Sequence, residues 1–152
     1  MANLFPSTDD FIWGDEQSVI DSDSSTVIFG KSWRYDYDAG DFVMTPSGRV
    51  ALADDKEAWV QWCHKALLTP RYRHVIYSRD YGSELEELIG TGQGRAVLES
   101  EMTRMITEAL LVDARTEAVD QFTFTWSEDH CTMTCRITSV QDDTEILESE
   151  VI

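Results

Sequence analysis

The chain has 152 residues, of which 29 are acidic and 12 are basic, so its formal net charge is −17. This length fits one domain, and a hydrophobic fraction of 42% is enough for a core. Binding to nucleic-acid phosphates needs clustered Lys and Arg, so the composition argues against it. No run of 18 apolar residues occurs, so we expect no membrane span. The acidity indicates a subunit that meets a basic partner surface, or it serves solubility alone.

The first 25 residues are polar and acidic, with a few apolar interruptions that include Phe5 and the run Phe11–Trp13. This pattern predicts an extended acidic N-terminal arm, residues 1–25, ahead of a single α+β domain, residues 26–152. Residues 1–10 have no basic stretch followed by an apolar one, so we expect a cytoplasmic origin and not secretion.

A β-rich region follows the arm. From Lys31 to Tyr37, three aromatic residues alternate with polar ones, which predicts a half-buried strand. Turn residues at 38–41 and 46–48 predict returning strands at 42–44 and 50–52.

Helical patterns occupy the middle of the chain. A capping box of Asp54 and Glu57 predicts the start of a helix that runs to about Leu68. Apolar residues at 3–4 spacing predict a second helix over Arg95–Leu111, with a buried stripe.

Between these helices we expect an extended segment at Arg71–Tyr77. A second capping box, Ser83 with Glu86, predicts a short helix through Leu88. The glycines of residues 90–94 lack the Lys-Ser/Thr pair of a phosphate-binding loop and indicate a flexible connection.

The C-terminal third is β again. Alternation over Gln121–Thr138 predicts a hairpin whose apolar face packs on the helix Arg95–Leu111. Cys131 and Cys135 point to one face of an extended strand, too far apart to form a disulfide with each other. A turn at residues 142–143 leads to an exposed third strand, Glu145–Val151.

No residue constellation specifies catalysis, so we predict that the protein is not an enzyme and needs no cofactor. Glycoside hydrolysis requires two carboxylates that face each other across a cleft, whereas the acidic groups of this chain lie in runs on helix surfaces. No G-x-S-x-G nucleophile motif occurs. Cys63 and His64 are adjacent on a predicted helix and therefore point apart. The scattered cysteines and histidines predict no metal site.

Arginine and tyrosine concentrate in one stretch of this acidic chain. Both residue types are enriched in the hot spots of protein interfaces, so the cluster predicts a docking surface. The alternative is a structural segment with internal Arg–carboxylate pairs. The residues concerned are Arg71, Tyr72, Arg73, Tyr77, Arg79 and Tyr81.

The same stretch resembles a known family. The segments 67–72, 76–78 and 81–85, with the Trp33–Asp41 hairpin and the Ala58–Trp62 helix, resemble XkdS-type prophage tail proteins, the sheath initiators of contractile tails. Residues 112–115 lie where the wider baseplate-wedge "lysozyme-like" family has a Glu-Pro-Arg signature. Here Asp113 replaces the Glu and Ala114 the Pro, and only Arg115 carries over.

The resemblance implies a small mixed sheet with two main helices, similar to the C-terminal domain of the tail sheath protein. It implies a structural protein of the baseplate, with no membrane and no nucleic-acid partner. Implied partners are the tail sheath protein, a baseplate wedge protein and tube-proximal hub proteins, with six copies per baseplate. Assembly in the bacterial host cytoplasm would precede incorporation into the tail of a phage, a bacteriocin or another injection system.

Two sites follow from the resemblance. Asp113 and Arg115 are expected to dock the wedge protein, and an internal Arg–Asp pair is the alternative. The edge strand, with Glu145, Leu147 and Val151, is expected to accept a sheath arm by strand addition and to tolerate proline at Leu147. The alternative function is that of a small acidic cytoplasmic adaptor or inhibitor that binds a basic partner.

Overall fold

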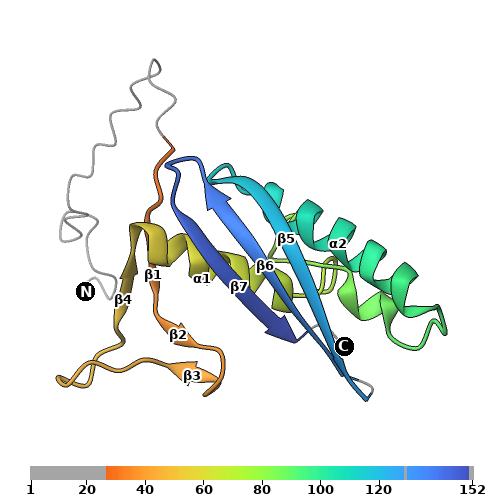
Figure 1. Ribbon diagram of the computed structural model, residues 1–152. Coiled ribbons are helices and arrows are strands. Elements are labelled where there is room, and N and C mark those ends of the chain that lie inside the picture. The colour runs from red at the N-terminus through yellow and green to blue at the C-terminus, as the bar shows by residue number, and fades with distance from the viewer. Residues whose placement is uncertain (1–26, 129, 151–152) are drawn as a thin grey trace, which may run out of the picture.

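A three-stranded antiparallel sheet is covered on one face by two helices in the computed structural model, which describes residues 27–128 and 130–150 (Figure 1). The strands are β5 (Thr116–Ser127), β6 (His130–Ser139) and β7 (Thr144–Glu150), in the order β5-β6-β7. Helix α2 (Arg95–Leu111) packs against β5, and helix α1 (Asp55–Leu68) packs against β7. The predicted α+β class is confirmed. The predicted 1–25 arm lies outside the described residues.

The core forms between the helices and the inner face of the sheet. Every second residue of β6 from Cys131 to Ile137 is at most 1% exposed, whereas the intervening threonines and Arg136 are partly exposed. Burial of each large apolar side chain contributes about 1.5–3 kcal/mol. Helix α2 contacts β5 and shares one core with the buried residues of β6, so the prediction that the hairpin packs on the helix Arg95–Leu111 is confirmed. The large fully buried side chains are Trp59, Met102, Ile106, Leu110, Met133, Ile137 and Leu147.

The three cysteines are free and buried, two in β6 and one, Cys63, in α1. Burial disfavours the thiolate, and it raises the pKa of Cys63 and of Cys135 to about 12. These thiols are core side chains, as the sequence predicted for Cys63.

A short-stranded hairpin projects from this body (Figure 1). Strand β1 (Lys31–Trp33) pairs with β4 (Leu52–Asp54), and β2 (Tyr35–Asp36) pairs with β3 (Asp41–Phe42). The predicted strand over residues 31–37 is thus divided at Arg34. The backbone of Arg34 donates to one returning segment, at Ala51, and accepts from another, at Val43.

Helix α1 ends where predicted, but its predicted capping box is absent. The carboxylate of Asp54 makes no capping hydrogen bond, and Glu57 binds the guanidinium of Arg34 with N–O distances of 2.6 Å. The guanidinium of Arg34 offers Glu57 two bonds and a full positive charge, whereas a capping box offers a single backbone N–H, so Glu57 turns to the hairpin.

The second predicted capping box is also wrong. The hydroxyl of Ser83 is buried and donates to the carbonyl of Leu67 at 2.7 Å, while Glu86 faces Arg73. The short helix exists as a single 3-10 turn, η2 (Leu85–Leu88).

The segment predicted to be extended at Arg71–Tyr77 is a series of turns, with Tyr72 in the left-handed region at φ +66°. A parallel bridge between Pro70 and Ser83 closes the base of this loop. The chain therefore leaves the body at residue 70, turns back and returns at residue 83.

Candidate assembly surfaces

Strand β7 is an edge of the sheet. It pairs with β6 through seven consecutive residue pairs, from Thr138–Thr144 to Thr132–Glu150, and no described strand pairs with its other side. The N–H of Ser139 donates to the carbonyl of Asp143 at the hairpin turn. Antiparallel pairs alternate, so the backbone groups of Leu147 face β6 and those of its neighbours Ile146 and Glu148 face outward.

The β7 side chains predicted to form the interface, those of Glu145 and Leu147, face the core, and the side chains that alternate with them face solvent. Leu147 is completely buried and belongs to the core, so its expected tolerance of proline is wrong. Glu145 turns inward and pairs with Lys56 of α1 at 3.0 Å. Ile146 is 72% exposed, and Glu148 and Glu150 are exposed as well. Val151 lies outside the described residues.

An acidic groove of about 700 Å³ lies beside this edge, between β7, β2 and the end of α1. Four carboxylates line it, and no Lys or Arg is among its lining residues. Burial lowers the pKa of His64 in its wall, so this ring is neutral at neutral pH and does not offset the carboxylates. The groove would favour a basic segment. Its acidic residues are Asp36, Asp38, Glu148 and Glu150.

The opposite edge of the sheet is irregular. The register of β5 shifts twice, between Thr116 and Ala118 and between Asp120 and Thr123, and Gln121 has φ +53°. Bulges of this kind deform an edge and hinder pairing with a further strand. Of the two edges of the three-stranded sheet, β7 is therefore the better acceptor.

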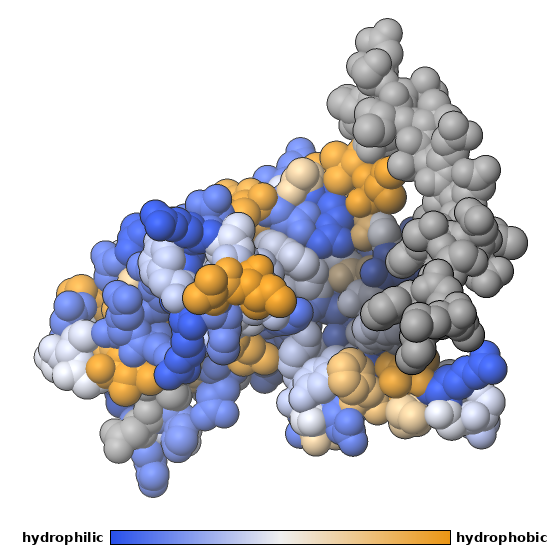
Figure 2. All heavy atoms as spheres, turned by 180° about the vertical axis from the view of Figure 1, so that it is seen from behind, coloured by the Kyte–Doolittle hydropathy of each residue, from blue (hydrophilic) through white to orange (hydrophobic). Residues whose placement is uncertain are grey.

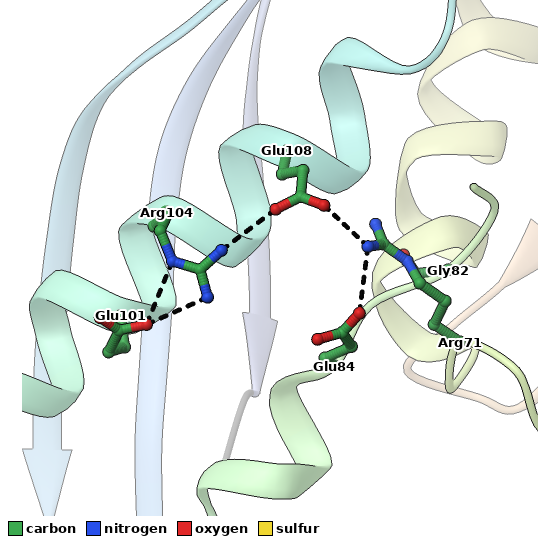
Figure 3. A network of polar contacts seen from close by, with 6 residues as sticks. All are labelled: Arg71, Gly82, Glu84, Glu101, Arg104 and Glu108. Atoms are coloured by element: carbon green, nitrogen blue, oxygen red, sulfur yellow. Dashed lines mark hydrogen bonds and ion pairs between the residues drawn. The ribbon is translucent and has the colours of Figure 1, made fainter. Parts of the chain in front are cut away.

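Arg71, from the predicted arginine and tyrosine cluster, braces the base of the loop (Figure 3). Its side chain is 7% exposed, and its guanidinium binds the carbonyl of Gly82 and the carboxylates of Glu84 and Glu108, at 3.1, 3.2 and 2.9 Å. The hydrogen bond from Arg71 lowers the pKa of Glu108. The bond between Arg71 and Glu108 joins the loop to α2, and Arg104, also on α2, binds the other oxygen of Glu108 at 3.1 Å. This arrangement matches the alternative of internal Arg–carboxylate pairs.

The other residues of the cluster lie nearer the surface. Arg73 makes a long, exposed contact with Glu86 at 3.4 Å, and Arg79 and Tyr72 are exposed. Tyr77 and Tyr81 pack against each other, with ring centroids 4.7 Å apart.

The tip of the loop carries apolar residues that sequence reasoning missed. Val75 and Ile76 are 102% and 87% exposed. They lie in the segment that was expected to be extended, and apolar residues in such a segment are ordinarily buried, so nothing in the sequence indicated that these two side chains face solvent. Their exposure at a loop tip is typical of a contact surface.

Arg115 is engaged within the chain. It forms a two-bond pair with Asp113, at 2.8 and 2.6 Å, and donates to the carbonyl of Phe29 at 2.8 Å. Its guanidinium also lies 5.7 Å from the ring centre of Trp62. The side chains of Arg115 and Asp113 are only 14% and 11% exposed. The bond from Arg115 to Phe29 ties the end of α2 to the start of the described chain. Docking of the wedge protein by Arg115 stays a prediction.

Within residues 27–128 and 130–150, no group of three or more His, Cys, Asp or Glu side chains could hold a metal ion. None of the helices in this part of the chain is long and apolar enough to cross a membrane.

The comparison with protein families assigns the class. Residues 31–143 match the family described as contractile injection system sheath initiator, so the chain belongs to that family and has a structural role in a contractile injection system. One similar protein is the phage-like element PBSX protein XkdS of Bacillus subtilis (strain 168). It is 30% identical over 106 residues, which cover 68% of this chain and 70% of XkdS.

Proposed function

We propose that this protein starts sheath polymerisation by accepting a strand of a sheath subunit on the free edge of β7. The observation that carries the proposal is the regular outward edge of β7 beside a groove lined by four carboxylates. Membership of the sheath-initiator family supports a partner of this kind.

Backbone hydrogen bonds supply the affinity in strand addition, and side chains supply the choice of partner. The backbone groups of Ile146 and Glu148 face away from β6 and suit an incoming strand. Carboxylates at Glu148 and Glu150 oppose pairing between two copies of this acidic edge and favour a basic arm. We also propose that the domain is similar to the C-terminal domain of the sheath protein, so that its edge offers the first sheath ring the surface that later rings offer one another.

The wider assembly is proposed on the same basis. The wedge and tube-proximal hub proteins would hold the protein in the baseplate, in six copies, after assembly in the host cytoplasm. No enzymatic step is part of this function.

A second candidate is an adaptor or inhibitor that binds a basic protein in the cytoplasm, since the acidic groove beside β7 fits such a partner as well. Such a protein would leave sheath recruitment unchanged when the edge is altered.

The test is the substitution Glu148→Pro, which removes an outward N–H from the edge strand. Edge positions tolerate proline, so we expect a folded protein that enters particles but recruits little sheath. The measurement is the ratio of sheathed to naked tubes by electron microscopy, with the amount of mutant protein per particle determined by immunoblot.

The matched control is Glu148→Ala, which removes the same carboxylate but keeps the N–H. We expect it to sheath more tubes than Glu148→Pro. Normal sheathing by a Glu148→Pro protein that is present in the particles would contradict strand addition at β7. Normal sheathing without the protein in particles would favour the adaptor.

A further inference from the structure

A second groove, of about 690 Å³, lies on the other side of the projecting hairpin, between the hairpin, α1 and the loop of residues 71–81. We call it the aromatic groove. Figure 2 shows apolar side chains on the hairpin and a hollow between the hairpin and the body. Its aromatic wall includes Trp33, Tyr35, Tyr37, Trp62, Tyr77 and Tyr81.

The wall formed by the hairpin is held in place by α1. The side-chain amide of Gln61 donates to the carbonyl of Tyr35 at 3.1 Å and accepts from its N–H at 3.3 Å. The hydroxyl of Tyr37 donates to the backbone carbonyl of Gln61 at 2.9 Å. Strand β2 pairs with β3, and these additional bonds attach β2 to α1, so the wall of the groove is held in place by the chain itself.

The charges of the aromatic groove are opposite to those of the whole chain. Its charged lining residues are Lys31, Lys65 and Arg115, with no carboxylate among them, in a chain of net charge −17. Asp113 offsets Arg115, which leaves the two lysines. Lys31 is 4.0 Å from Asp54 with a largely exposed side chain, and the ammonium of Lys65 lies 5.2 Å from the ring centre of Tyr77.

The tyrosine hydroxyls add no negative charge. Burial raises the pKa of Tyr37 and of Tyr81 to about 12, so both are neutral at physiological pH. The positive charge of the lysines is therefore not cancelled within the lining of the groove.

The hairpin separates two grooves of opposite charge. Tyr35 and Tyr37 line both the aromatic groove and the acidic groove beside β7. A basic strand at β7 and a second partner in the aromatic groove would therefore touch the same thin wall.

We infer that the aromatic groove docks an acidic segment of a second baseplate protein, in which carboxylates are interspersed with apolar side chains. The lysines match the carboxylates, and the tyrosines and tryptophans match the apolar side chains. The inference rests on the proposed function only in placing this partner in the baseplate.

A protein segment fits the site better than a small molecule. Ile76 at the loop tip lines the aromatic groove and is 87% exposed, and its sequence neighbour Val75 is fully exposed. Tyr, Trp and Arg at the centre of a surface, with exposed apolar residues around it, are typical of protein interfaces.

The first experiment places a photocrosslinking amino acid at Ser78, an exposed residue in the lining of the aromatic groove, and irradiates assembled particles. We expect a crosslink to a segment of another particle protein with more Asp and Glu than Lys and Arg. The same photocrosslinker at Thr123, exposed on β5, is the control position and should not reach that segment. A crosslink to a basic segment, to residues 1–26 of the same chain or to a second copy overturns the inference, as does no crosslink at all.

The second experiment tests the charge. Lys65→Glu should reduce the yield of the Ser78 crosslink about tenfold, and Lys65→Arg should preserve it. Arg73→Glu makes the same change in net charge on the loop that carries Ser78, but Arg73 lies outside the lining, so this variant should leave the yield near that of the unaltered protein. Equal losses from Lys65→Glu and Arg73→Glu would overturn the inference, because they would show a general effect of charge. The crosslink does not depend on the edge of β7, so it can fail while the Glu148→Pro test succeeds.

Discussion

At the scale of single residues, Arg115 has a structural role that its position in a family signature does not reveal. Asp113 occupies two of its donor groups, and the carbonyl of Phe29 accepts from the third nitrogen. Arginine can serve all these acceptors at once because its guanidinium is planar, whereas the single ammonium of lysine cannot.

We therefore expect Arg115→Lys to lower the free energy of unfolding by about 1–2 kcal/mol, since two partly buried acceptors lose partners. Urea denaturation of the purified protein measures the change. Arg104→Lys, at an exposed i,i+3 and i,i+4 position on α2, is the control and should change the stability by less than about 0.5 kcal/mol. An Arg115→Lys protein of unchanged stability that no longer enters particles would instead support the predicted docking of the wedge protein.

The capping boxes show why some residue partners could not be predicted from the sequence. Asp54 and Glu57 have the right spacing for a local cap, and the helix begins where that spacing places it. The competing partner of Glu57 is Arg34, which is 23 residues away. Local spacing carries no information about such a contact, whereas it locates the helix well.

At the scale of elements, the spacing of apolar residues in the sequence predicted the helices and strands that bury one face, such as α2 and β6. The bounds of α2 match the prediction, because its apolar residues face the common core. Strand β5 begins at Thr116, before the predicted start of the hairpin at Gln121. The loop of residues 71–81 was mispredicted because its apolar residues, Val75 and Ile76, face solvent. Its shape depends on the closed base between residues 69–71 and 82–84, which no local pattern shows.

Gly82 lies where the two backbone segments at the base of the loop approach each other closely. It has φ +102°, and a Cβ atom there would lie 2.6 Å from the backbone carbonyl oxygen of Thr69. We expect Gly82→Ala to destabilise the protein by roughly 2–4 kcal/mol, because both strain and a backbone clash oppose it. Thermal and urea unfolding measure the loss.

Gly92→Ala is the matched control for this substitution. Gly92 also has a positive φ, +67°, but a Cβ atom there would meet nothing within 4 Å. Its cost should be about 1 kcal/mol, from backbone strain alone. Equal costs at the two positions would show that the base of the loop relaxes and that its close packing does not hold the loop in place.

At the scale of the whole molecule, charge is segregated by the hairpin. The net charge of −17 is evident from composition, but the separation of an acidic groove from an aromatic groove with two lysines appears only in the fold. Segments distant in sequence, the hairpin and β7, together form the acidic groove. The sequence predicted the acidic edge strand that forms one side of this groove, but it did not predict that residues 35–38 of the hairpin form the other side.

If the acidic groove recruits the sheath, the rate of that association should depend on the salt concentration through the carboxylates of this groove. If a basic strand enters the acidic groove, the association rate of purified sheath subunits should fall as the salt concentration rises from about 20 mM to about 300 mM, because the Debye length shortens. Glu148→Gln with Glu150→Gln should reduce both the rate at low salt and its dependence on salt.

The control is Glu86→Gln with Glu101→Gln, which also changes the net charge from −17 to −15, but these residues do not line the groove. Stopped-flow fluorescence of labelled sheath protein measures the rates. If the two double variants lose the same fraction of the rate, the overall charge of the molecule governs the encounter, and the acidic groove has no special part in recruiting the sheath.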